Sequence, residues 1–153
     1  MPNIKKVELS TKVIKGLQTR TKNADEMDEE TRKIAPLWGR FFSDIMPKPG
    51  DTPPPLYGVY ANYESDATGM YDLLIGAEGL DEGSDLKDVT IEAGRYLVFP
   101  VKGDLSTEVI KVWGQIWAYF EDVSIDEKRV FKTDFELYTA MDEAEIYIGV
   151  HYV

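Results

Sequence analysis

Two glutamate–tyrosine pairs near the carboxyl end of the chain have the spacing of residues that share one face of a β-strand. Glu136 and Tyr138 form the first pair, and Glu145 and Tyr147 form the second. Side chains alternate between the two faces of a strand, so the aliphatic residue inside each pair points the other way. We expect the aliphatic face to contact a helix and the other face to carry both carboxylates and both phenols. Such a face is either a binding surface or an ordinary solvated one.

An internal repeat brings further aromatic residues toward Glu136. An offset of 78 residues relates Gly58 to Glu136, and the same offset relates Tyr60 to Tyr138. The ring is therefore kept in both copies, whereas the carboxylate occurs once. Aromatic faces attract cations by roughly 0.5–2 kcal/mol, and a semi-buried carboxylate favours a charged partner. We expect a groove for a flat cation, with Glu136 as its floor and open space at Gly58. Its walls would be Tyr60, Tyr138 and Tyr147.

The tryptophans follow the same repeat. Trp38 corresponds to Trp113 at an offset of 75 residues. Trp117 lies one helical turn after Trp113, so the two indoles face nearly the same way. Two interpretations stay open: these indoles belong to the core, or they flank the groove.

The composition excludes several classes of function. The 17 Lys and Arg residues against 28 Asp and Glu residues give a net charge of −11, which repels nucleic-acid phosphates. A negative field attracts cations, although solubility alone would also explain it. The absence of cysteine excludes thiolate chemistry and disulfides. The single histidine, His151, is typical of a strand edge. No metal or phosphate-loop motif occurs, so we expect no metal, no cofactor and no catalytic residue.

No apolar run is long enough for a membrane helix, and the amino terminus lacks the apolar region of a signal peptide. We therefore expect a cytoplasmic protein without membrane contact.

The hydrophobic periodicity predicts an α+β domain over residues 1–153, built from two β-α-β-β units at about 1–79 and 86–153. Together the units would form one curved antiparallel sheet, with the helices on one face and a central ligand groove. The expected strands cover 7–21, 56–64, 71–78, 88–101, 134–140 and 144–152, and the helices follow 34–45 and 109–120.

Local signals refine these elements. We expect a strand interruption near Ile14–Gly16, and a helix that begins near Ala35 or is kinked by Pro36. Ser106 or Thr107 is the expected cap of the second helix. Prolines predict a loop over 47–55, and acidic residues with glycines predict a linker over 78–87.

The order of several segments resembles the GyrI-like, or AraC-type, effector-binding domain. These segments are Ile91–Tyr96, the tryptophan-bearing helix, Asp134–Tyr138 and Glu145–Val150. Gly16–Thr21 and Pro36–Trp38 resemble the free-standing members, some of which are carried on integron cassettes. The resemblance spans essentially the whole chain.

This resemblance implies a duplicated fold with a central pocket for amphipathic, often cationic, aromatic compounds. It implies Glu136 as the pocket acid, and Glu145 with Tyr147 as a second acid and its aromatic neighbour. Many members have proline where this chain has Gly149, which would loosen the last strand. No helix-turn-helix is expected, so a DNA-binding partner would be a transcription regulator on another chain.

We therefore expect a non-enzymatic, multidrug-type binder of cationic amphipathic molecules, acting as sensor, sequestering protein or transcription co-regulator. The resemblance leaves two alternatives: a hydrolase of small electrophiles in which a glutamate activates water, and a gyrase-type protein–protein inhibitor. The expected ligand-binding residues are Glu136, Tyr138, Glu145, Tyr147, Trp113, Trp117, Tyr60 and Trp38.

Overall fold

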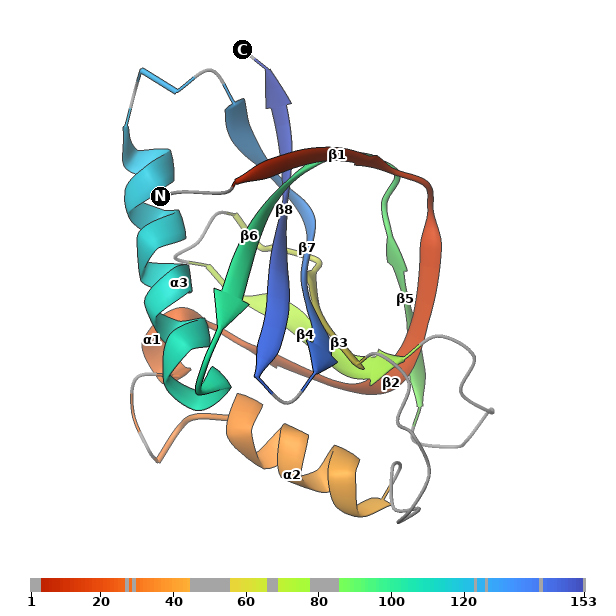
Figure 1. The fold of residues 1–153 in the computed structure, drawn as a ribbon. Helices are drawn as coiled ribbons and strands as arrows, with labels where there is room; N and C mark the ends of the chain where they lie inside the picture. Colours follow the sequence, from red (N-terminus) through yellow and green to blue (C-terminus); the bar gives the residue numbers. More distant parts are fainter. Residues whose placement is uncertain are drawn as a thin grey trace.

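In the computed structural model, the described residues form eight antiparallel strands in one curved sheet, with three helices outside it (Figure 1). The structure describes residues 4–26, 28, 30–44, 56–65, 69–77, 86–122, 124–125, 127–140 and 142–152. The strands are β1 (Lys5–Leu9), β2 (Lys12–Thr21), β3 (Leu56–Ala61), β4 (Tyr71–Ala77), β5 (Lys87–Ile91), β6 (Gly94–Lys102), β7 (Glu127–Ala140) and β8 (Glu143–Tyr152). The helices are α1 (Asn23–Glu26), α2 (Ile34–Asp44) and α3 (Leu105–Glu121). The predicted α+β class and curved antiparallel sheet are confirmed.

The order of the strands has a twofold pattern. It runs β1-β6-β8-β7-β3-β4-β2-β5. Read from its two ends, it pairs corresponding strands of the two copies: β1 with β5, β6 with β2, β8 with β4, and β7 with β3. The implied axis passes between β3 and β7, where Gly58 pairs directly with Glu136. This order supports the predicted duplication and places the Gly58–Glu136 difference between the copies beside the axis.

The sheet buries side chains on both faces. The inner face holds one cluster from six strands, including Ile91 of β5 and Tyr96 of β6, although these strands lie far apart in the strand order. The sheet must therefore curl to bring them together. The outer face is covered by α2 over one half and α3 over the other, each with its own apolar cluster around Phe41 or Ile116. Each large apolar side chain buried in this way contributes roughly 1.5–3 kcal/mol.

Helix α2 begins at Ile34, with Pro36 in its first turn, where a missing N–H costs nothing. The carboxylate of Glu26 accepts hydrogen bonds from the backbone N–H of Lys33 at 2.9 Å and of Ile34 at 3.0 Å. A side chain from α1 thus caps α2 and holds the two helices together.

Two of the local predictions are wrong. The first strand breaks between Leu9 and Lys12 rather than near Gly16, which pairs with Gly76 inside the sheet. A Cβ on Gly16 would lie 1.9 Å from the carbonyl oxygen of Ile75, so glycine here allows a close backbone approach.

Helix α3 also begins before Ser106, and the backbone N–H groups of Thr107 and Glu108 both donate to the carbonyl of Asp104. The predicted cap at Ser106 or Thr107 therefore lies inside the helix. The predicted loop at 47–55 and most of the linker at 78–87 lie outside the described residues.

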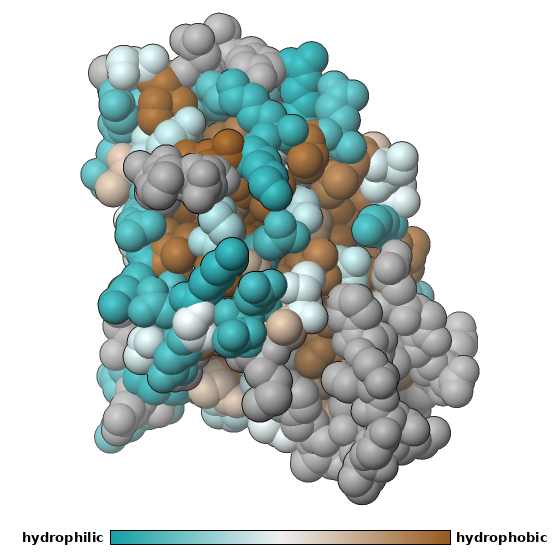
Figure 2. Space-filling model, in the orientation of Figure 1, coloured by the Kyte–Doolittle hydropathy of each residue, from teal (hydrophilic) through white to brown (hydrophobic). Residues whose placement is uncertain are grey.

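On the face shown in Figure 2, the described surface intersperses hydrophobic side chains with hydrophilic ones. Among the described residues, no helix is both long and apolar enough to cross a membrane.

Candidate functional site

Glu136 lies at the centre of the outer face, where the helix-covered halves of the sheet meet. It is 4% exposed and stands directly opposite Gly58 in the register of β3 and β7. A Cβ on Gly58 would lie 3.2 Å from Oε1 of Glu136. The space that glycine leaves is therefore occupied by the glutamate carboxylate, which reaches across the axis.

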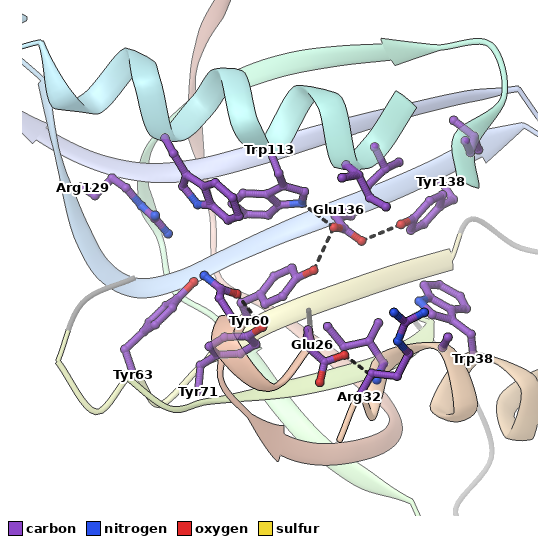
Figure 3. A pocket seen from close by; sticks show the side chains of 17 residues that line it. Glu26, Arg32, Trp38, Tyr60, Tyr63, Tyr71, Trp113, Arg129, Glu136 and Tyr138 are labelled. Atoms are coloured by element: carbon purple, nitrogen blue, oxygen red, sulfur yellow. Dashed lines mark hydrogen bonds between the residues drawn. The ribbon is translucent and has the colours of Figure 1, made fainter. Parts of the chain in front are cut away.

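Three neutral side chains donate hydrogen bonds to this carboxylate (Figure 3). Oε2 accepts from the Tyr60 hydroxyl at 2.9 Å and from Nε1 of Trp113 at 2.6 Å. Oε1 accepts from the Tyr138 hydroxyl at 2.5 Å. The donors come from β3, α3 and β7, so the site forms only when these elements pack together.

Burial raises the pKa of the Glu136 carboxyl above its ordinary value, and the hydrogen bonds from Tyr138, Trp113 and Tyr60 lower it part of the way back. Burial and the neighbouring carboxylate also raise the pKa of both tyrosines well above the usual range, so they stay neutral donors. Within the described residues, Glu136 makes no ion pair. When ionised, it is a buried charge that hydrogen bonds stabilise and no cation neutralises.

A cavity of about 570 Å³ opens beside Glu136, between the two long helices. Seven of its seventeen lining residues are aromatic, and four are charged, two acidic and two basic. The lining residues are Asn23, Glu26, Arg32, Ile34, Ala35, Trp38, Tyr60, Tyr63, Tyr71, Leu105, Val109, Ile110, Trp113, Trp117, Arg129, Glu136 and Tyr138.

Two aromatic pairs repeat across the axis. Trp113 meets Tyr60 edge-to-face with ring centres 5.3 Å apart, and Trp38 meets Tyr138 in the same way at 5.2 Å. Each pair joins a helix of one half to a strand of the axis. These contacts fix the ring planes that surround the carboxylate.

Six of the eight ligand-binding residues expected from the sequence line this cavity: Glu136, Tyr138, Tyr60, Trp38, Trp113 and Trp117. Glu145 and Tyr147 do not. The register sets Ile146 opposite Glu136 and Glu145 opposite Leu137, so Glu145 and Tyr147 lie on the inner face. The expectation that both glutamate–tyrosine pairs share one face is therefore wrong.

The physical reason is that both faces of the sheet are buried. The Tyr147 ring stacks on Phe135 of the inner cluster at 4.3 Å, and its hydroxyl donates to Glu145 at 3.0 Å. Burial on two sides gives both faces an apolar pattern, and alternation alone does not tell which face meets the helices.

Sequence reasoning missed a further polar group at one end of the cavity, which includes Tyr63 and Arg129. Asn62 adopts a positive φ of 51°, which ends the alternation of β3 and turns Tyr63 to the same side as Tyr60. Arg129 lies before the predicted start of the strand at Asp134. Alternation along the predicted strand 56–64 set Tyr63 on the face opposite Tyr60, and Arg129 lay outside every predicted element.

Comparisons with known proteins agree with this fold. Residues 7–150 match the family described as Cass2, integron-associated effector binding protein. The proposed transcriptional regulator YobU of Bacillus subtilis (strain 168) is 30% identical over 141 residues, 85% of this chain and 82% of YobU.

Two solved structures are also similar. The integron cassette protein VCH_CASS2 of Vibrio cholerae superimposes with a TM-score of 0.87 at 33% identity, over 98% of this chain and 97% of that one. The protein SAV2435, solved bound to tetraphenylphosphonium, has a TM-score of 0.72 at 19% identity and shares the fold over 97% of this chain and 94% of its own. The chain belongs to the family of integron-associated effector binding proteins.

Proposed function

We propose that this protein binds one cationic, amphipathic, aromatic small molecule in the cavity beside Glu136. The observation that carries the proposal is a buried carboxyl group for which the described residues supply hydrogen-bond donors but no cation. A carboxylate that is 4% exposed is surrounded by two phenols and one indole, all neutral. A bound cation would supply the missing opposite charge.

The electrostatic gain would be substantial in such a place. Two unit charges 4 Å apart attract by about 4 kcal/mol at the effective dielectric constant of a partly buried site. Cation–π contacts with the surrounding rings would add roughly 0.5–2 kcal/mol each. The buried carboxylate carries its desolvation cost whether or not a ligand is present, so little of the gain is lost on binding.

The lining and the size favour an aromatic, amphipathic ligand. Drug-sized ligands occupy cavities of about 300–1,000 Å³ with mainly apolar and aromatic walls, and this cavity has about 570 Å³. The tetraphenylphosphonium complex of SAV2435, which shares the fold, supports a lipophilic cation in this class of protein.

Binding is favoured over hydrolysis by the same hydrogen bonds. Both oxygens of Glu136 already accept from side chains, so the carboxylate is better suited to hold a charge than to activate water. As an effector sensor, the protein would act through a transcription regulator on another chain, which the name of the relative YobU supports.

The test is a titration with tetraphenylphosphonium, followed by the fluorescence of the three tryptophans, Trp38, Trp113 and Trp117, which all line the cavity. Glu136→Gln keeps the side-chain shape and removes the charge, and tyrosine hydroxyls can rotate to match the amide. We expect the dissociation constant to rise roughly 10- to 100-fold, the value of a charge-assisted interaction.

Glu145→Gln is the matched control, because it removes the same charge from the neighbouring strand on the other face. It should leave the affinity unchanged. Tetraphenylborate, an anion of nearly the same shape, should bind far more weakly than tetraphenylphosphonium. Equal affinity of wild type and Glu136→Gln for the cation would contradict the proposal.

A further inference from the structure

Strand β7 contains a bulge that changes which face Arg129 occupies. Arg129 pairs with Val150 and Asp134 pairs with Ile148, so five steps along β7 match two steps along β8. Phe131 within the bulge has a positive φ of 54°. In a regular strand Arg129 would share the inner face with Phe135, six residues away. The three extra residues turn it to the outer face, where Glu136 lies.

Arg129 forms a buried ion pair there. Its Nη2 donates to Oδ2 of Asp134 at 2.6 Å, and the two side chains are 7% and 0% exposed. Asp134 also accepts from the Tyr63 hydroxyl at 2.5 Å and from the backbone N–H of Gly149 at 2.8 Å. The aspartate is fully satisfied and neutralises the arginine, so this end of the cavity carries no net charge.

The arginine is not satisfied. Among the buried side-chain nitrogen and oxygen atoms of the described residues, the one without a hydrogen-bond partner is Nε of Arg129. Of its three nitrogens, only Nη2 has an acceptor in the described part of the chain. Buried donors are rarely left unpaired in native proteins, because an unpaired donor loses its hydrogen bonds to water without replacement.

The guanidinium group is held in place, and Arg129 borders the same cavity as Glu136. Nε itself has almost no accessible surface, so the nitrogen that a ligand would meet is Nη1, which also has no acceptor among the described residues. The guanidinium group lies 4.3 Å from the centre of the Phe131 ring and 6.0 Å from that of Tyr63. Arg129 lines the cavity, and Figure 3 shows it on the other side of Trp113 from Tyr138. The cavity therefore has a carboxylate in its middle and a rigid, neutralised donor group at one end.

We propose that the Arg129 end of the cavity is a subsite for an uncharged hydrogen-bond acceptor, such as a carbonyl oxygen of the ligand. This inference rests on the proposed function and narrows its ligand class. The preferred ligand is an aromatic cation that carries an acceptor on an arm, rather than a purely lipophilic cation. Arg129 selects for the acceptor, and Glu136 selects for the charge.

Two probes with the same cation separate these roles. Pentyltriphenylphosphonium has a plain alkyl arm, whereas the methyl ester of (4-carboxybutyl)triphenylphosphonium has a carbonyl on an arm of similar length. For the wild-type protein, calorimetry should give a dissociation constant roughly 5- to 50-fold lower for the ester, the value of a hydrogen bond from a charged donor.

Arg129→Lys tests the donor. Lysine keeps a positive charge beside Asp134 but lacks the planar fork of the guanidinium, so the ester should lose its advantage while the pentyl probe keeps its affinity. Arg20→Lys, the same change at an arginine outside the lining, should keep the advantage. Glu136→Gln should weaken both probes by the same factor and preserve their ratio.

A measurement on the wild type covers the case in which Arg129→Lys does not fold. With ¹⁵N-labelled arginine, the Nε–H resonance of Arg129 should shift on titration with the ester and stay in place with the pentyl probe. Equal affinities of the two probes for the wild type would overturn the subsite alone. Failure of the pentyl probe to bind would overturn the cation site on which it rests.

Discussion

Glu136 combines two properties that rarely occur together in a stable core: it is titratable, and it is almost fully buried. Its three hydrogen-bond donors hold the carboxylate in one position, and no cation among the described residues neutralises it. The charge that a ligand would meet is therefore set by the pKa of a single residue. Ligand binding should therefore depend on pH more strongly than it would if several surface carboxylates supplied the charge.

The affinity for tetraphenylphosphonium should fall on acidification. Because burial raises the pKa of Glu136, the carboxylate is ionised above this raised value and becomes neutral as the pH falls through it. If the cation binds only the ionised form, the dissociation constant should rise about tenfold per pH unit below that pKa. Titrations between neutral and mildly acidic pH measure this slope.

The Glu136→Gln variant is the control and should show no such slope.

The stability of the free protein should change with pH in the opposite direction from the affinity. A raised pKa favours the protonated folded state, so stability is highest at low pH and is lost as the pH rises through the folded pKa. In urea unfolding, the free energy of unfolding of Glu136→Gln should increase relative to that of the wild type as the pH rises. A difference independent of pH would contradict this assignment.

At the scale of elements, the cavity depends on the position of α2, which carries Trp38. The amino terminus of α2 is held by Glu26, whose carboxylate accepts from two backbone N–H groups and from the Thr21 hydroxyl at 2.6 Å. A negative charge at this end also complements the helix dipole. One side chain thus connects the end of β2, helix α1 and helix α2.

Glu26→Ala should lower the free energy of unfolding by about 1–2 kcal/mol, the usual cost of a lost helix cap. Urea denaturation followed by circular dichroism measures it. Glu30→Ala removes an exposed carboxylate from the same segment and should change stability by less than about 0.5 kcal/mol. Equal losses in the two variants would show that general charge, and not capping, is responsible.

The elements also explain which parts of the site could be predicted. Strand alternation and helical spacing predicted that Tyr60, Tyr138 and the indoles gather around Glu136. The face was wrong, because Glu136 was expected away from the helices and lies on the helix-covered face, where Trp113 of α3 donates to it.

Glu145 lies away from the helices, as expected. It was wrongly grouped with Glu136 because both faces of the curled sheet are buried, and β7 turns the apolar Phe135 and Leu137 to the inner face. Arg129 was missed because a bulge of three extra residues reverses its face, and no periodic pattern signals a bulge.

At the scale of the whole molecule, the twofold order of the strands gives the cavity a symmetrical frame and an asymmetrical charge. Trp113 with Tyr60 and Trp38 with Tyr138 repeat across the axis, whereas Glu136 faces Gly58. A second carboxylate at position 58 would stand beside the first, and two such groups cannot both ionise easily. The site therefore accommodates one ionised carboxylate. By symmetry, that carboxylate could stand at position 136 or at position 58.

Moving the carboxylate across the axis tests that equivalence. A Cβ at position 58 would lie 3.8 Å from Cζ2 of Trp38, so a glutamate there would approach Trp38 as Glu136 approaches Trp113. Glu136→Gly alone should lose roughly 10- to 100-fold in affinity for tetraphenylphosphonium. Adding Gly58→Glu to this variant should recover most of that loss, with one ligand bound per chain by calorimetry. A double variant that folds with an unchanged circular dichroism spectrum, yet binds no better than Glu136→Gly, would show that the two halves are equivalent in backbone only.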